Sequence, residues 1–189
     1  GEVTETSEIR PTSQRGSRRA VAEQEWMSLY HRHGVPVHIF RLSGIYGPGR
    51  SALDSARVGV ARRIEKQGHL FNRIHVEDIV QVLKASFEHP KPGSFYNLAD
   101  DHPSASHEVI AEACNLLGIE VPPLIPYEEA DMAPITESFY KDNKVVNNQK
   151  IKTELGVALK YPNYRVGLMG CLAAEEYALS QELEEQQKA

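Results

Sequence analysis

Apolar segments with the character of strands alternate with helical patterns through the first hundred residues, and this order limits the fold more than any other feature. The sequence predicts strands at residues 37–42, 70–74 and 94–98, and its clearest helix at residues 76–87. Strands that alternate with helices are typical of layered α/β proteins with a mainly parallel sheet. Three strands are too few for a complete doubly wound sheet. We therefore expect one α/β domain that is incomplete.

The remaining helices are predicted from apolar periodicity and from end signals. Their expected bounds are residues 17–33, 53–67, 106–117, 147–155 and 164–188. One face of the first helix carries four residues at helical spacing, Ala22, Trp26, Leu29 and His33. The second helix is the weakest, because Gly59 interrupts it. Residues 1–16 are polar and turn-rich with no strand of their own, and residues 120–134 are irregular and rich in proline.

The composition excludes several classes of function. A net charge of −5 argues against a nucleic-acid partner, because domains that track phosphates are normally basic. Cys114 and Cys171 lie on otherwise apolar helical faces, so they build neither a disulfide framework nor a cysteine-based metal site, and we expect no metal. We see no apolar run of about 18 residues and no signal peptide, so we expect no membrane partner. The expected location is the cytoplasm or an organelle stroma or matrix, and not the secreted space.

Two segments carry the strongest functional signal. The first, residues 37–49, reads VHIFRLSGIYGPG. The second, residues 73–80, reads RIHVEDIV, and YNLAD follows one helix later at residues 96–100. In open α/β sheets, ligands bind beyond the carboxyl ends of the strands. The loop at residues 43–50 is therefore placed to line a pocket.

The glycines of that loop allow a second explanation. Gly44, Gly47 and Gly49 permit sharp turns, and a tight turn accounts for them as well as a pocket does. They do not form the G-x-G-x-x-G fingerprint, and we expect no helix to begin directly after them. We therefore do not interpret this loop as a phosphate cradle.

In order and spacing, the two segments resemble the C-terminal half of the extended short-chain dehydrogenase/reductase family, the NAD(P)-dependent epimerases and dehydratases. The chain is most similar to an atypical branch of uncharacterised epimerase-like proteins of bacteria and plastids, over nearly its whole length. The resemblance implies the C-terminal half of a Rossmann-type doubly wound parallel sheet in residues 1–100. It implies a small, mostly helical substrate-side portion in residues 101–189. It also implies NAD or NADP as cofactor and a small polar metabolite as substrate.

The catalytic pair of that family is replaced in this chain. Family members place a tyrosine, and a lysine four residues later, early in the helix before the YGP strand; Arg15 and Arg19 occupy these positions. An arginine keeps its proton near neutral pH, so Arg15 cannot act as the family's acid/base, whereas Arg19 can still hold a ribose or a phosphate. The resemblance places five residues at the cofactor, Ser13, Arg19, Leu42, Ser43 and Gly44.

The resemblance assigns Tyr46, Arg73 and His75 to the substrate pocket. Nucleotide-sugar members carry a diphosphate-binding arginine at the position of Phe71, so Arg73 lies out of the usual register and a nucleotide sugar is not supported. His75 is open to a second interpretation, because a lone histidine beside an apolar run is usually a satisfied core residue.

Other charged residues have structural interpretations. Arg41 lies on an apolar strand and is expected in an ion pair, and Glu77 and Asp78 suit the first turn of a helix. Three arginines of the predicted helix 53–67 form either an anion site or, as we favour, a solvated face: Arg57, Arg62 and Arg63.

Three hypotheses on function remain. The family's cofactor fingerprint belongs to a first βαβ unit, which this sequence does not contain, so we expect the C-terminal portion of a longer protein. That protein is either an epimerase/dehydratase-like oxidoreductase or a non-catalytic NAD(P)-binding regulatory or scaffold protein. A helical interaction module that uses the last helix is a weaker third hypothesis. The sequence does not indicate the substrate, the choice between NAD and NADP, or the oligomeric state.

Overall fold

The computed structural model describes residues 1–188, with side chains to residue 186. The strands are β1 (Glu2–Val3), β2 (His38–Leu42), β3 (Gly44–Tyr46), β4 (Arg63–Glu65), β5 (Arg73–His75), β6 (Ser94–Leu98), β7 (Leu124–Pro126) and β8 (Val145–Val146). The helices are α1 (Gln14–His33), α2 (Ala52–Arg57), α3 (Val76–Glu88), α4 (Ser106–Leu117), α5 (Pro134–Phe139), α6 (Gln149–Leu155) and α7 (Tyr164–Lys188), with a 3₁₀ turn, η1 (Tyr127–Glu129).

Every strand pair in the described residues is parallel. The pairs are β2 with β6, β3 with β5, β4 with β7 and β1 with β8. The longest ladder joins His38 to Ser94 and continues to Leu42 and Leu98. The predicted α/β class with parallel strands is confirmed. The three predicted strands correspond to β2, β5 and β6, but the described residues contain further short strands, and all of the strands lie in two-stranded pairs.

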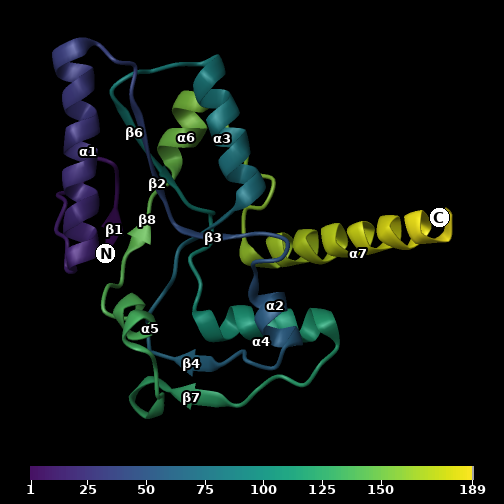
Figure 1. Ribbon diagram of the computed structural model, residues 1–189. Helices are drawn as coiled ribbons and strands as arrows, with labels where there is room; N and C mark the ends of the chain where they lie inside the picture. Colours follow the sequence, from purple (N-terminus) through teal and green to yellow (C-terminus); the bar gives the residue numbers. More distant parts are fainter. Residues whose placement is uncertain (189) are drawn as a thin grey trace.

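One half of the molecule is built on the β2–β6 pair. In Figure 1, α1 lies on one side of these strands and α3 and α6 lie on the other. A buried cluster fills the second interface: Ile74, Val82, Tyr96, Leu98, Ile151, Leu155 and Val157. On the first side, Arg41 of β2 pairs with Glu23 of α1 at 2.7 Å, which confirms the predicted ion pair.

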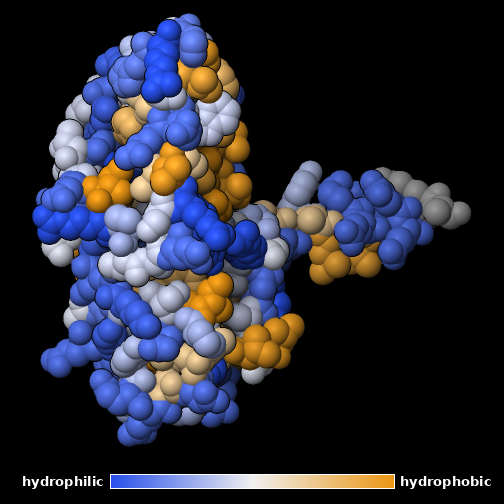
Figure 2. All heavy atoms as spheres, turned by 60° about the vertical axis from the view of Figure 1, so that its left-hand side comes forward, coloured by the Kyte–Doolittle hydropathy of each residue, from blue (hydrophilic) through white to orange (hydrophobic). Residues whose placement is uncertain are grey.

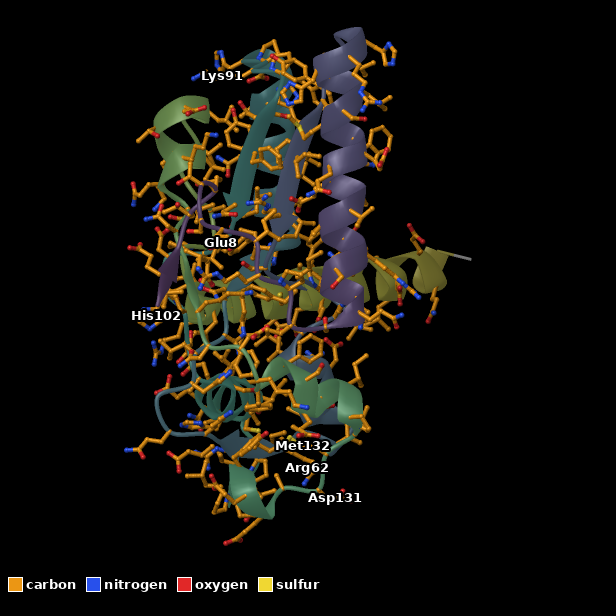
Figure 3. The ribbon with its side chains drawn as sticks, turned by 90° about the vertical axis from the view of Figure 1, so that its left-hand side faces the viewer. Glu8, Arg62, Lys91, His102, Asp131 and Met132 are labelled. Atoms are coloured by element: carbon orange, nitrogen blue, oxygen red, sulfur yellow. The ribbon has the colours of Figure 1, made fainter. Side chains whose placement is uncertain are left out.

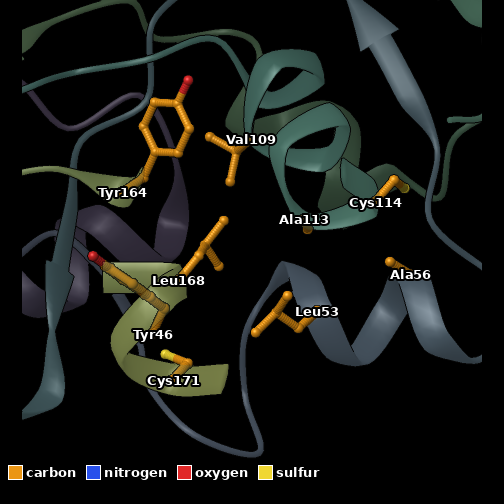
Figure 4. Packing of buried hydrophobic residues seen from close by; sticks show 9 residues of the cluster. All are labelled: Tyr46, Leu53, Ala56, Val109, Ala113, Cys114, Tyr164, Leu168 and Cys171. Atoms are coloured by element: carbon orange, nitrogen blue, oxygen red, sulfur yellow. The ribbon is translucent and has the colours of Figure 1, made fainter. Parts of the chain in front are cut away.

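The other half packs α2, α4 and the first turns of α7 together (Figure 1). Its core is shown in Figure 4 and consists of Tyr46, Leu53, Ala56, Val109, Ala113, Cys114, Tyr164, Leu168 and Cys171. Both cysteines are buried and free. Beyond this core, α7 projects from the body (Figure 1).

Some expected elements differ from the structure. Helix α1 begins at Gln14, and the predicted face is exposed, with Trp26 57% exposed, while Met27 is buried. The expected helix 53–67 ends at Arg57, and residues 63–65 form β4. Strand β4 pairs with β7, which lies in the segment expected to be irregular. A partner some sixty residues away determines this strand, so local periodicity does not reveal it.

None of the helices within residues 1–188 combines the length and the apolar character that a membrane crossing needs.

Candidate functional site

A cavity of about 480 Å³ opens beyond the carboxyl end of β3. It is lined by Ile45, Tyr46, Arg50, Ser51, Ala52, Asp54, Ser55, Arg73, Ser106, Val109, Ile110, Tyr164 and Leu168. The parallel register of β3 and β5 places Tyr46 beside His75, so both strands end at the same edge. Of the three residues that the family resemblance assigned to the substrate pocket, the structure brings Tyr46 and Arg73 to this cavity.

The loop before the cavity is shaped by close packing and by a short helix. A Cβ on Gly47 would lie 2.6 Å from Cγ1 of Val76, so a larger residue would displace the start of α3. Helix α2 begins at Ala52, three residues after Gly49 and one residue before the predicted start of this helix. Ser51 and Asp54 form a capping box that satisfies its first turn.

Tyr46 lines the cavity, but its hydroxyl is buried against the backbone of α7 at Gly167. The residue is 8% exposed, and its hydroxyl has no hydrogen-bond partner in the described part of the chain. Its ring meets His75 edge-on at 5.1 Å between centroids. Burial, and then the nearby Asp100 carboxyl, raise the pKa of Tyr46. The hydroxyl therefore stays protonated in its buried position.

Arg73 and Asp100 form a second polar group next to Tyr46. Nη1 of Arg73 donates to the carbonyls of Phe71 at 3.2 Å and Ser104 at 3.1 Å. Burial lowers the pKa of Arg73, while the Asp100 carboxyl raises it. Asp100 is 2% exposed; its Oδ1 accepts the His102 N–H at 3.1 Å, and its Oδ2 has no partner among the described residues. Burial raises the pKa of Asp100 to about 7.

His75 lies in the core and does not line the cavity. Its Nδ1 accepts the Glu77 N–H at 3.2 Å and so caps α3, while Nε2 lies 3.5 Å from Sγ of Cys171. Burial lowers the pKa of His75, which favours the neutral ring. The structure supports the core interpretation of this histidine. Asp78 is likewise structural, because its carboxylate accepts the N–H groups of Lys160 and Tyr161.

The residues assigned to the cofactor lie apart from this cavity. Ser13 caps α1 by accepting the Gly16 N–H at 3.1 Å. Arg15 and Arg19 are exposed on the first turns of α1, with no hydrogen bond or ion pair to any described residue. The carboxyl end of β2 is open to solvent as well. Its last residue, Leu42, is exposed, Ser43 after it is half-exposed, and Gly44 is exposed. The structure does not bring Arg15 and Arg19 into one cavity with Tyr46 and Arg73.

The three arginines of the predicted helix 53–67 are engaged within the protein. Arg57 pairs with Glu175 at 2.6 Å, and Arg63 donates to the carbonyls of His107 and Pro122. Arg62 donates to the carbonyl of Asp131, and the two residues lie side by side in Figure 3. The three arginines therefore form neither an anion site on one helix nor a solvated helix face, and both interpretations are wrong. Arg62 and Arg63 do not lie on a helix.

The sequence predicted that the loop at residues 43–50 lines a pocket, and Arg50 of that loop does so. Sequence reasoning gave no individual role to Arg50 or to Asp100. Each stands within a few residues of the carboxyl end of a strand, Arg50 after β3 and Asp100 after β6. That position is a signal for a binding residue in a parallel sheet. The burial of Asp100 depends on distant segments and has no local signature. Among the described residues, no group of three His, Cys, Asp or Glu side chains is arranged to hold a metal ion.

Comparison with known proteins gives the fold but not a named family. No family model matches the chain. Protein YeeZ of Escherichia coli (strain K12) is 28% identical over 165 residues, which are 86% of this chain and 54% of YeeZ. A solved protein of Silicibacter pomeroyi DSS, described as functionally unknown and conserved, is 50% identical with a TM-score of 0.86, over 91% of this chain and 60% of that one.

A third comparison relates the fold to enzymes. The dTDP-glucose 4,6-dehydratase (rfbB) of Bacillus anthracis str. Ames, solved with NAD, matches with a TM-score of 0.73 and 21% identity, over 94% of this chain and 56% of the dehydratase. The chain thus shares the Rossmann-like fold of NAD-dependent sugar-nucleotide dehydratases and epimerases, in mixed α/β layers with parallel strands. It spans between one half and two thirds of the length of these relatives.

Proposed function

We propose that the chain supplies the substrate-side part of an NAD(P)-binding, epimerase/dehydratase-like oxidoreductase that acts on a small polar metabolite. One observation carries the proposal: a cavity of small-molecule size opens beyond the carboxyl end of β3, with Arg73 on its wall. In open α/β sheets, ligands bind at this edge. The shared Rossmann-like fold supports NAD or NADP as cofactor.

Two of the regions assigned to the cofactor, Arg19 and the end of β2, are exposed and therefore accessible to a dinucleotide. Arg19 is exposed and unpaired within the described chain, so its five N–H donors are available to a ribose hydroxyl or a phosphate. The exposed residues Leu42 and Gly44 lie at the carboxyl end of β2, where the cofactor of a Rossmann-type sheet would be expected. A bound NAD(P) would supply hydride transfer. The chain's own part would be to orient the cofactor through Arg19 and the substrate through Tyr46 and Arg73.

A non-catalytic NAD(P)-binding protein of the same fold is the alternative. It is favoured by Arg15, which stands at the position of the family's catalytic tyrosine and holds its proton near neutral pH. Arg15 makes no hydrogen bond to any described residue, so no neighbour is placed to activate it. An enzyme would then need an acid or base from another residue.

The cofactor assignment is tested by comparing Arg19→Ala with Arg15→Ala in the full-length protein. We expect Arg19→Ala to weaken NADH or NADPH binding by at least about tenfold, since a hydrogen bond to a charged group contributes about 1.5–3 kcal/mol. Arg15→Ala should weaken binding less.

Fluorescence or calorimetric titration measures both affinities. Equal losses, or a larger loss with Arg15→Ala, would refute the assignment. Substrate-dependent oxidation of the reduced cofactor would decide for an enzyme over a binding protein.

A further inference from the structure

Two arginines on the cavity wall lack a carboxylate partner. Arg73 uses Nη1 on two backbone carbonyls, and its Nε and Nη2 make no hydrogen bond within the described chain. The guanidinium of Arg50 makes no hydrogen bond or ion pair to a described residue, although it lines the same cavity. Arg57, which leaves the cavity region with α2, is by contrast paired with Glu175. Neither of the two arginines that line the cavity is therefore bonded to a carboxylate of the described chain.

The carboxylates near the cavity do not neutralise these charges by contact. Asp54 lines the cavity, but its Oδ2 is held by the N–H and hydroxyl of Ser51 at 2.6 and 3.1 Å. Asp100 lies close enough to influence Arg73, yet the two side chains form no salt bridge. The Arg73 guanidinium is partly buried without a bonded counter-charge, which is unfavourable, and an anion from solution would relieve that cost. Arg50 is exposed and adds a second free guanidinium to the same cavity.

The rest of the wall favours a small organic molecule over a bare ion. Apolar side chains from three elements also line the cavity: Ile45, Val109, Ile110 and Leu168. Figure 4 shows Val109 and Leu168 facing the space beside Tyr164. A volume of about 480 Å³ lies within the range of small-molecule sites.

We propose that this cavity binds a small organic anion, whose carboxylate or phosphate group is held by Arg50 and Arg73. The inference rests on the proposed function in treating the cavity as the substrate site, and it narrows the substrate from polar to anionic. A guanidinium binds either anion through parallel N–H donors, so the two sources share one recognition chemistry.

The test is calorimetric titration of the full-length protein, without NAD(P), at low ionic strength. The probes are inorganic phosphate, glucuronate and glucose, of which glucose is the uncharged analogue of glucuronate. The variants are Arg50→Gln and, as a matched control, Arg32→Gln, which removes an exposed charge at the far end of α1. Arg73→Lys keeps the buried charge but loses the planar fork. We expect at least one anion to bind saturably, and Arg50→Gln and Arg73→Lys to weaken it about tenfold while Arg32→Gln leaves it unchanged.

Each outcome decides the matter. Preference for glucuronate assigns a carboxylate, and preference for phosphate assigns a phosphate. The proposal fails if glucose binds as tightly as glucuronate, if neither anion binds saturably, or if Arg50→Gln has no larger effect than Arg32→Gln. Folding of each variant is checked by its thermal melt. Because NAD(P) is absent from this titration, its failure leaves the cofactor assignment standing, and loss of cofactor binding alone leaves the anion site standing.

Discussion

Single residues on α7 decide how closely that helix approaches the cavity wall. A Cβ on Gly167 would overlap the ring and hydroxyl of Tyr46, and a Cβ on Gly170 would overlap the ring of Tyr161. Glycine in a helix normally costs about 0.5–1 kcal/mol relative to alanine. Here the two glycines allow two tyrosines to pack against the helix backbone, so the helix gives up intrinsic stability for packing.

We predict that Gly167→Ala lowers the free energy of unfolding by about 1–3 kcal/mol, because the added methyl overpacks the contact with Tyr46. The usual sign of a Gly-to-Ala change in a helix is thereby reversed. Chemical denaturation measures the effect. As a control, Tyr46→Leu combined with Gly167→Ala should cost less than the sum of the two single changes, since the clash is then removed. An increase in stability on Gly167→Ala would contradict the packing described.

Asp100 gives a second prediction, through pH. Its folded-state pKa of about 7 lies above the ordinary value of 3.8, so between these limits the native state binds more protons than the unfolded state. Stability contributed by the protonated carboxyl is present at low pH and is lost as pH rises through about 7. Arg73, Asp101 and Asp78 are the charged groups that influence this carboxyl. As the pH rises from mildly acidic to alkaline, the unfolding free energy of Asp100→Asn should therefore increase relative to that of the wild type by about 2–4 kcal/mol.

Denaturation of the wild type and Asp100→Asn across this pH range measures that gain. An Asn amide oxygen can still accept the His102 N–H, so the local turn is kept. A difference between the two proteins that does not change with pH would show that Asp100 stays ionised in the folded state.

The sequence predicted residues whose role follows from simple chemistry. Arg41 was expected to need a counter-charge on its apolar strand, and Glu23 supplies it. The roles of Arg50 and Asp100 could not be predicted, because both depend on segments far apart in the chain. Arg50 is a candidate binding residue because no carboxylate of the described chain is bonded to it. Asp100, which lies beside Arg73, has a raised pKa because it is buried. Neither property can be recognised from the residues that are neighbours in the sequence.

Among the elements, long periodic helices were predicted well. Helix α4 has the expected bounds, and α3 and α7 agree closely with expectation. Strands β4 and β7 are three residues each and are stabilised by pairing with one another, so neither shows a pattern of its own. The buried face of α1 was predicted wrongly, because packing of Met27 and the Glu23–Arg41 pair determine it instead of the apolar stripe.

The short helix α2 is held by its capping box, which gives a third prediction. Ser51→Ala removes the hydroxyl that accepts the Leu53 N–H at 3.1 Å. We expect a loss of about 1 kcal/mol in unfolding free energy, as for other serine caps. Ser180→Ala is the control, because its hydroxyl bonds to Tyr177 within an exposed stretch of α7 and caps nothing. Equal effects in urea denaturation would show that the cap does not anchor α2.

At the scale of the whole molecule, apolar side chains are exposed on two separate helices. Helix α1 exposes Val21, Trp26 and Leu29. The projecting part of α7 exposes Tyr177, Leu179 and Leu183, and Figure 2 shows apolar side chains along one side of it. Strand β2 pairs with β6, and within residues 1–188 its other edge has no partner strand. Exposed apolar faces and open strand edges favour association.

We predict that the 189-residue chain self-associates as its concentration rises. Sedimentation velocity should show a concentration-dependent increase in mass, and thermal melts should report modest stability. The single tryptophan provides a site-specific signal, because Trp26 is 57% exposed and lies in the α1 face described above. If α1 forms the contact, its emission shifts to the blue over the same concentration range, and Leu29→Gln moves both transitions to higher concentration. Leu183→Gln on α7 serves as the matched change on the other helix. A chain that stays monomeric, with constant tryptophan emission and one sharp melt above about 60 °C, would show that these faces do not drive association.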